Sequence, residues 1–221
     1  MVTSDERYSR QRELVPAERL ASCRISIIGV GSVGRNVALQ LAAMCVPSLQ
    51  LIDHDAVEPS NLASQGYLEA DLGRLKVEAT AEMCCRINGE LAVEVVPARF
   101  RRSMEVGNAV FCCVDTIEAR RFVWQAVQDR ADFFCDGRMS AEVLRVLTAC
   151  DASGREHYPT TLFAPEQAYR GRCTSPGAAY CGALAAGLML SQFAKWLRRL
   201  PVEPDLTLNL LASEGSCIQA G

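Results

Sequence analysis

Three glycines near the start of the chain, Gly29, Gly31 and Gly34, have the spacing G-x-G-x-x-G. Glycine at the first two positions lets the backbone approach a phosphate closely, and glycine at the third allows a helix to pack tightly. The amino end of that helix supplies N–H groups and positive potential. Asp53, which ends the next apolar segment, is placed to bind ribose hydroxyls. This pattern predicts an adenine-nucleotide site.

The elements that must position these residues alternate between strand and helix. Apolar runs of β-branched residues predict buried strands, and apolar residues at helical spacing predict the helices between them. The alternation predicts an α/β fold with a doubly wound, mainly parallel, Rossmann-like sheet, whose ligands lie beyond the carboxyl ends of the strands. The predicted strands are 24–30, 49–53, 91–97, 109–115, 133–135, 142–150 and 206–211, and the predicted helices are 33–45, 75–87, 117–129 and 177–197.

The second half of the chain breaks this alternation. Residues 151–177 are polar and rich in Pro, Gly, Thr and Arg, which predicts a long crossover loop. The predicted strand at 133–135 is expected to end at Asp136-Gly137. We expect residues 1–221 to form a single domain that a C-terminal helix and strand close.

Composition excludes several classes of function. The net charge of -3 and the pI near 5.5 argue against a nucleic-acid or membrane partner, because either would favour a clustered basic surface. The polar N-terminus has no apolar stretch of a signal peptide, so a cytoplasmic location is expected. The longest apolar run, 178–190, is too short to span a bilayer and predicts a buried helix.

The eleven cysteines lack the spacing of a disulfide framework. In a reducing compartment they should be free thiols, most of them small core residues. The sequence contains no C-x-x-C pair, so no zinc is expected. His54 and His157 have no evident metal partners; the first is expected in a loop near ribose and the second at the surface.

Four segments outside the glycine motif carry a family resemblance. They are Arg7-Tyr-Ser-Arg-Gln11, Asp53-His-Asp-Ala-Val-Glu-Pro-Ser-Asn61, Gly73-Arg-Leu-Lys76 and Cys113-Val-Asp115. In order and spacing they resemble the ThiF/MoeB and ubiquitin-activating adenylyltransferases, over residues 7–138 and more loosely to the end.

Adenylation of a carboxylate brings two anions together and releases magnesium pyrophosphate, so it needs cations on the phosphates and a carboxylate for the metal. Lys76 and Arg10 can supply the positive charge, and Asp115 the carboxylate. The resemblance implies that Lys76 contacts the phosphates, that Asp115 binds Mg²⁺ and that Arg10 acts across a homodimer interface. It implies ATP as the nucleotide, bound by Gly29, Gly31, Gly34, Asp53, Asp55, Asn61 and Lys76, with Asp53 on ribose and Asn61 on the triphosphate.

Each of these residues also has a structural explanation. Lys76 could be solvated on its helix, and Arg10 could lie in a flexible tail. Asp115 could cap the helix that follows, and Asn61 could stabilise its own turn. The functional interpretation rests on their common register with the family.

Two departures from the family pattern stand out. Ser64 occupies the position where the family usually has an arginine before the glutamine of S-N-L-x-R-Q, so one phosphate contact is missing. Arg74 could substitute for it, or could be an exposed helix arginine. Thr116 stands where the family often has asparagine after the metal-binding aspartate.

Cys173 is the candidate nucleophile. It lies in Arg170-Gly-Arg-Cys-Thr-Ser-Pro176, directly before the last predicted helix. Cys173-Thr174 resembles the C-T segment of ubiquitin-like activating enzymes, whose cysteine keeps the acyl group as a thioester. The flanking arginines and the helix amino end favour the nucleophilic thiolate. A loop cysteine without a catalytic role is the alternative, and Cys181 is expected in the core.

These observations favour an ATP-dependent enzyme that adenylates the C-terminal carboxylate of a ubiquitin-like or sulfur-carrier protein and then forms a thioester on Cys173. Lack of zinc-type cysteine pairs favours the ubiquitin-like branch, and a conjugating enzyme is a further candidate partner. Two other hypotheses stay open: an NAD-dependent oxidoreductase, and a nucleotide-binding scaffold without catalysis. The sequence does not distinguish among thioester, thiocarboxylate and adenylate as the product.

Overall fold

The computed structural model describes residues 9–163 and 178–218. The strands that it contains are β1 (Ile25–Ile28), β2 (Ser48–Ile52), β3 (Ala92–Val96), β4 (Ala109–Cys112), β5 (Phe133–Ser140), β6 (Val143–Ala149), β7 (Asp205–Asn209) and β8 (Glu214–Ile218). The helices are α2 (Ala17–Ala21), α3 (Ser32–Ala43), α4 (Pro59–Gln65), α5 (Lys76–Ile87), α6 (Ile117–Val127), α7 (Ala152–Thr160) and α8 (Ala179–Leu197), with a 3₁₀ turn η1 at Glu69–Asp71.

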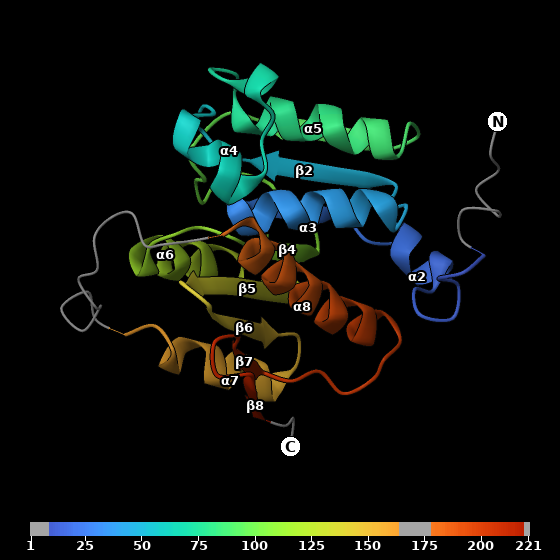
Figure 1. Ribbon diagram of the computed structural model, residues 1–221. Coiled ribbons are helices and arrows are strands. Elements are labelled where there is room, and N and C mark those ends of the chain that lie inside the picture. The colour runs from blue at the N-terminus through green and yellow to red at the C-terminus, as the bar shows by residue number, and fades with distance from the viewer. Residues whose placement is uncertain (1–8, 164–177, 219–221) are drawn as a thin grey trace.

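All eight strands form one sheet in the order β3-β2-β1-β4-β5-β6-β7-β8. The strands from β3 to β5 pair in parallel, and those from β5 to β8 pair in antiparallel fashion. The chain moves outward from β1 to β3 and then returns to place β4 on the other side of β1. In Figure 1, β2 lies near the top of the sheet, and β5 and β6 lie below it. This reversal creates a switch point at the carboxyl ends of β1 and β4, where ligands of doubly wound folds bind. The predicted α/β class and mainly parallel sheet are confirmed.

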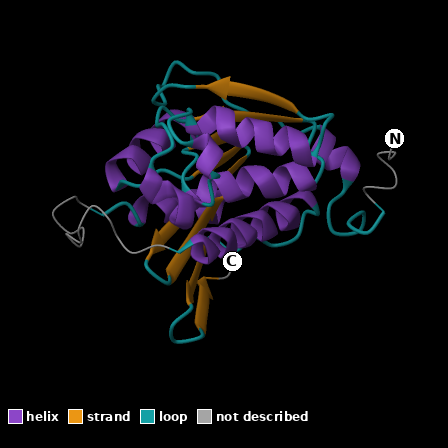
Figure 2. Ribbon diagram, turned by 45° about the horizontal axis from the view of Figure 1, so that its top comes forward, coloured by secondary structure: helices purple, strands orange, loops and turns teal. Residues whose placement is uncertain are grey.

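Helices cover the two faces of the sheet. Helices α3, α5 and α8 lie side by side on one face, as Figure 2 shows, and bury residues such as Val37, Leu41 and Phe193 against the strands. On the other face, Trp124 of α6 and Tyr158 of α7 pack edge-on against Phe134 of β5 and tilted against each other, with ring centroids 4.8–5.0 Å apart. Burial of these apolar surfaces holds the carboxyl ends of the strands in a fixed arrangement.

Several boundaries differ from the prediction. Strand β5 does not stop at Asp136 but continues to Ser140, because the buried Asp136 side chain is neutralised by arginines. The segment expected to be a long loop begins with helix α7, which Asp151 caps by accepting a hydrogen bond from the Gly154 amide at 2.8 Å. Helix α4, which follows β2, is not among the predicted helices. Strand β7 is followed by β8, so β7 does not close the sheet.

The apolar run 178–190 falls almost wholly within α8, which buries Cys181, Ala185 and Met189 as expected of a core helix. In the described parts of the chain, no helix is both long and apolar enough to cross a membrane.

Candidate nucleotide-binding site

The glycine turn joins β1 to α3 at the switch point. Gly29 has a φ of +89°, and a Cβ atom there would lie 2.7 Å from the Cys113 carbonyl oxygen of the loop after β4. A Cβ atom on Gly34 would lie 1.9 Å from the Gly29 oxygen, so only glycine allows α3 to start so close to the turn. Gly31 is the N-cap of α3 and provides no side-chain cap, which leaves first-turn N–H groups available to an anion.

Asp53 fixes the conformation of this turn. It follows β2, the neighbour of β1, and its Oδ2 atom accepts a hydrogen bond from the Val30 amide at 2.6 Å. Its Oδ1 atom accepts a hydrogen bond from the Asp55 amide at 2.9 Å. Each carboxylate oxygen has more than one lone pair, so Asp53 can still accept hydrogen bonds from a ribose.

Lys76, the first residue of α5, is only 7% exposed, so it is not the solvated helix lysine that was the alternative. Its Nζ atom lies 3.3 Å from Asp55 Oδ2. The Tyr67 hydroxyl joins the same region to the glycine turn by donating to the Val30 carbonyl at 2.7 Å. Desolvation raises the pKa of Tyr67, so its hydroxyl stays protonated as a donor at neutral pH.

His54 lies closer to possible metal ligands than the sequence indicated. Ligand atoms of Asp53, His54 and Asp55 all fall within 4.8 Å of one another. However, Arg99 Nε donates to His54 Nε2 at 3.0 Å, and Asp55 is paired with Lys76. The contacts of His54 with Arg99 and of Asp55 with Lys76 therefore account for the arrangement of these side chains.

Asp115 follows β4 and is exposed at the same edge of the sheet. It does not cap α6: the cap is Thr116, whose Oγ1 accepts a hydrogen bond from the Ala119 amide at 3.2 Å. The Asp115 carboxylate has no hydrogen bond or ion pair with the residues that the structure describes. A free carboxylate at the switch point suits a hard cation such as Mg²⁺.

Asn61 has the structural role that was considered as an alternative. Its Oδ1 atom accepts a hydrogen bond from the Glu58 amide at 2.9 Å and so stabilises the start of α4. Ser64, at the position of the missing arginine, donates from Oγ to the Ser60 carbonyl at 2.7 Å within the same helix. The Ser64 carbonyl accepts a hydrogen bond from Ser32 Oγ at 2.9 Å, which holds the end of α4 against the first turn of α3.

Arg10 is not brought to this site within one chain. Its neighbour Gln11 donates from Nε2 to the Met44 carbonyl at 3.1 Å, at the end of α3 opposite the glycine turn. The 12 residues of α3 separate these two ends by about 18 Å. Arg10 itself is exposed.

A buried charge cluster beside the switch point was not predicted from the sequence. Asp136 of β5 is 0% exposed and accepts hydrogen bonds from Arg120 of α6, from Arg138 at 2.7 Å and from the Tyr158 hydroxyl at 3.0 Å. Arg138 also donates to the Thr161 carbonyl at 2.9 Å. The cluster connects α6, β5 and the end of α7. Only the unusual Asp-Gly-Arg sequence inside a β-rich segment could have indicated it.

Cys173 lies outside the described residues. The ten described cysteines are free thiols, as expected, and five of them are buried. Desolvation raises the pKa of the Cys84 thiol to about 12 and that of the Cys112 thiol to about 12, so both are protonated and unreactive at neutral pH.

His157 was expected at the surface but is half-buried, with its Nε2 atom 2.9 Å from Asp205 Oδ2.

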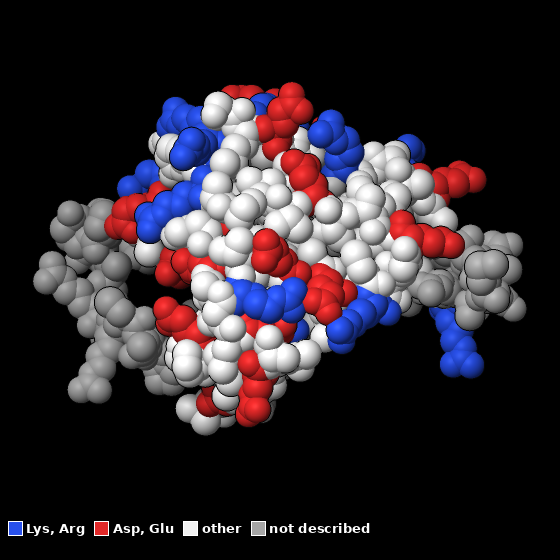
Figure 3. Space-filling view, turned by 90° about the horizontal axis from the view of Figure 1, so that it is seen from above, with Lys and Arg blue, Asp and Glu red and all other residues white. Residues whose placement is uncertain are grey.

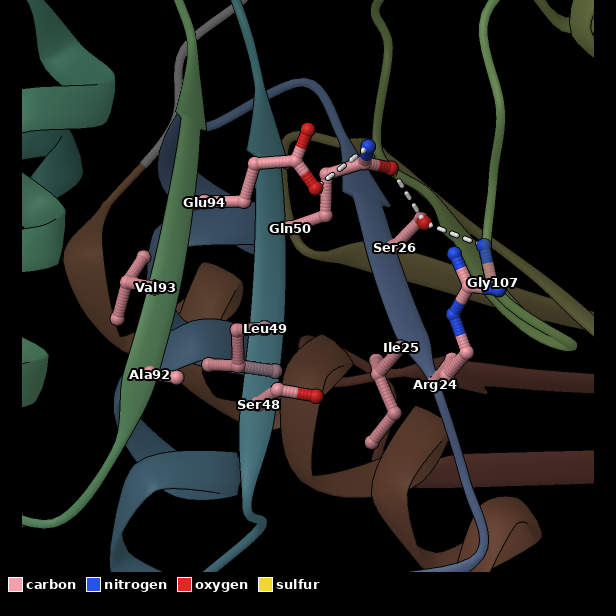
Figure 4. A pocket seen from close by; sticks show the side chains of 10 residues that line it. All are labelled: Arg24, Ile25, Ser26, Ser48, Leu49, Gln50, Ala92, Val93, Glu94 and Gly107. Carbon is pink, nitrogen blue, oxygen red and sulfur yellow. Dashed lines mark hydrogen bonds between the residues drawn. The ribbon is translucent and has the colours of Figure 1, made fainter.

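A separate hollow of about 300 Å³ lies at the amino ends of β1, β2 and β3, away from the glycine turn (Figure 4). Ser26, Gln50 and Glu94 form a polar row across it, with Ser26 donating to Gln50 at 2.7 Å and Gln50 to Glu94 at 3.1 Å. These side chains satisfy one another's hydrogen-bonding groups.

On the face that Figure 3 shows, basic and acidic side chains are interspersed, as expected of a solvated surface.

The glycine turn at the switch point, with an acid after β2 and another after β4, defines a doubly wound α/β protein of the type that binds nucleotides there. The model of the ThiF family matches residues 8–211, so the chain belongs to the ThiF family. The resemblance inferred from the sequence is confirmed.

Individual relatives match part of the chain. The SAMP-activating enzyme E1 of Haloferax volcanii is 36% identical over 107 residues, which cover 46% of this chain and 40% of that protein. The molybdopterin-synthase adenylyltransferase of Salmonella typhimurium is 31% identical over 125 residues, 52% of this chain and 50% of that protein. The chain thus spans half or less of the length of these relatives. The crystal structure of Escherichia coli MccB with MccA-N7isoASN superposes with a TM-score of 0.81 at 16% identity, over 99% of this chain and 73% of that one, and shares the fold.

Proposed function

We propose that the protein uses ATP and Mg²⁺ to adenylate the C-terminal carboxylate of a ubiquitin-like or sulfur-carrier protein. The observation that carries the proposal is the convergence of four features on one edge of the sheet: the glycine turn, Asp53, the buried Lys76, and Asp115, which pairs with no residue that the structure describes. The names of the relatives, an E1 activating enzyme and a molybdopterin-synthase adenylyltransferase, support the same reaction class.

The residues have distinct tasks in this reaction. The first-turn amides of α3 and the Lys76 ammonium stabilise negative charge on the phosphates, and Asp53 accepts hydrogen bonds from the ribose. Asp115 would hold Mg²⁺, which neutralises the departing pyrophosphate. A carboxylate oxygen of the carrier attacks the α-phosphorus, and the bond from that phosphorus to pyrophosphate breaks. Desolvation of Lys76 in its buried position strengthens its interaction with a phosphate.

Two further steps extend the proposal. The Cys173 thiolate attacks the acyl carbon of the adenylate, so a carbon–sulfur bond forms and AMP leaves. Transfer of the acyl group to a conjugating enzyme would follow the thioester.

Arg10 lies far from the glycine turn of its own chain, and this position supports a homodimer in which Arg10 reaches the site of the partner.

Carrier-dependent exchange of labelled pyrophosphate into ATP tests the first step. We expect Lys76→Ala and Asp115→Ala each to lower the exchange rate about 100-fold or more, the scale of losing one charged group from a desolvated site. Exchange at the wild-type rate in both variants would overturn the assignment. A carrier adduct that reducing thiols release, and that Cys173→Ala abolishes, tests the thioester step.

A binding protein without catalysis is the second candidate, and the Ser64 hydrogen bond inside α4 favours it, because that side chain is not directed at a phosphate. Such a protein would bind ATP and exchange no pyrophosphate with any carrier. Membership of the ThiF family gives no support to the NAD-dependent oxidoreductase.

A further inference from the structure

The site lacks one cation where Ser64 replaces the arginine of the family pattern. The end of α4 that carries Ser64 is held against the first turn of α3 by the bond from Ser32 Oγ to the Ser64 carbonyl, at 2.9 Å. A cation that replaces the missing arginine must therefore lie near the junction of α3 and α4. The following inference rests on the proposed function.

Arg74, the substitute considered from the sequence, is already engaged. It is not on a helix but in the segment before α5, where Nη1 lies 3.0 Å from Asp71 and Nη2 2.8 Å from Glu82. Two carboxylates thus neutralise its single positive charge. Arg74 holds η1 and α5 together and is not a free cation.

Arg35 is placed at the junction itself. It lies in the first turn of α3, directly after Gly34, and is 5% exposed. Its guanidinium carbon lies 4.7 Å from the centroid of the Tyr67 ring, and its Nη1 atom lies 3.5 Å from where a Cβ atom of Gly66 would be. The guanidinium therefore packs against Gly66 and Tyr67, the two residues that directly follow Gln65.

The surroundings of Arg35 leave its charge uncompensated. No carboxylate within the described part of the chain forms an ion pair with it, and its buried Nε atom has no hydrogen-bond partner. Stacking on Tyr67 offsets only part of the cost of burying a charge. Gln65 Oε1 is likewise buried without a partner, and a Cβ atom on Gly31 would lie 3.9 Å from it. Two unsatisfied polar atoms thus lie at one junction, next to the uncapped amino end of α3.

We propose that Arg35 is the phosphate-binding cation that replaces the arginine missing at position 64, so that α3 instead of α4 supplies the charge for the ATP triphosphate. A planar guanidinium donates two parallel hydrogen bonds to phosphate oxygens, which suits this role. Lys76 is paired with Asp55, and Arg35, whose guanidinium carbon lies 4.7 Å from the Tyr67 ring centroid, provides a second positive charge.

Calorimetric titration of the whole protein with MgATP, without any carrier, tests this assignment. Arg35→Met keeps an apolar stem over Tyr67 but removes the charge, and we expect it to weaken ATP binding at least tenfold. Adenosine, which has no phosphate, should bind with less than a twofold change. Adding Ser64→Arg to Arg35→Met should recover most of the lost affinity, and Arg74→Met, the matched control, should change ATP affinity less than twofold.

The outcomes separate this inference from the proposed function. Wild-type protein that binds no ATP overturns both, whereas ATP binding that survives Arg35→Met overturns the inference alone. Equal weakening of ATP and adenosine also overturns it, because it indicates a structural role. If Arg35→Met does not fold, Arg35→Lys keeps the charge without the fork; we expect a threefold to tenfold loss for ATP alone, and an unchanged ATP affinity contradicts the proposal.

Discussion

The Asp53 carboxylate accepts a hydrogen bond from the Val30 amide at 2.6 Å, so the acid at the end of β2 fixes the glycine turn at the end of β1. An acid in this position is usually considered for its contact with ribose. Here it also determines the shape of the glycine turn. Loss of the carboxylate therefore affects both nucleotide binding and folding.

Asp53→Asn provides a first prediction. The asparagine amide has one oxygen and one NH₂ group, so it can accept a hydrogen bond from the Val30 amide or from the Asp55 amide, but not from both. One hydrogen bond to a charged acceptor is therefore lost. We expect the free energy of unfolding to fall by about 1.5–3 kcal/mol, together with weaker ATP binding. Urea denaturation measures the first effect. Asp115→Asn is the control. The Asp115 carboxylate has no partner in the described structure, so the free energy of unfolding of this variant should equal that of the wild type.

Asp115 and Thr116 are neighbours with separable roles. Thr116→Ala removes the cap of α6 and should cost about 1 kcal/mol of stability. Asp115→Ala should leave stability within about 0.5 kcal/mol of wild type but abolish Mg²⁺-dependent pyrophosphate exchange. Thermal unfolding and exchange assays on both variants test this division. A stability loss confined to Asp115→Ala would show that the roles are reversed.

The parallel half of the sheet could be predicted from the sequence because its signals are local. Apolar β-branched runs such as Ile25–Ile28 end in glycine or an acid, and amphipathic helices follow them. The glycine turn and Asp53 were recognisable for the same reason, since their spacing sets their geometry. Strand β8 gave no such signal, because all its residues are exposed and it has no apolar face.

The missed features depend on contacts between residues distant in sequence. Asp136 resembled a strand end because an isolated acid is costly to bury, and only the fold shows that Arg120 and Tyr158 neutralise and solvate it. Arg35 lies on an otherwise ordinary helix, and its burial results from Tyr67, 32 positions further along the chain. Neither environment has a periodic signature in the sequence.

The Asp136 cluster leads to a prediction about stability. Arg120→Met removes one partner of a fully buried carboxylate and should destabilise the protein by about 3–5 kcal/mol. Chemical denaturation measures the loss. Arg86→Met is the matched control, because Arg86 forms an exposed pair with Glu82 and its removal should cost less than about 1 kcal/mol. Equal losses in the two variants would contradict the importance of burial.

Asp205 should make stability depend on pH in the acid range. Burial alone would raise its pKa, but hydrogen bonds from Arg145 and His157 outweigh this effect and hold the pKa below its ordinary value. The resulting stabilisation is present above the unfolded pKa of about 3.9 and is lost as pH falls through the lower folded value. Arg145→Met should therefore reduce stability at pH 7, and its difference from wild type should shrink below pH ~4. A difference that is constant from pH 7 to pH 3 contradicts the argument.

The cysteines offer a test that reaches the candidate nucleophile. Native protein treated briefly with iodoacetamide at pH 8 should react at the exposed Cys85 and Cys217 and not at the buried Cys84, Cys112 and Cys135. Burial, through desolvation, raises the pKa of each of these three thiols, so little thiolate forms there. If Cys173 is activated, peptide mass spectrometry should show it alkylated faster than Cys85 and Cys217, and still reactive at pH 6.5, where ordinary thiols slow sharply. Alkylation of Cys173 at the rate of Cys217 at both pH values would argue against an activated thiolate and leave adenylation as the only step supported for this protein.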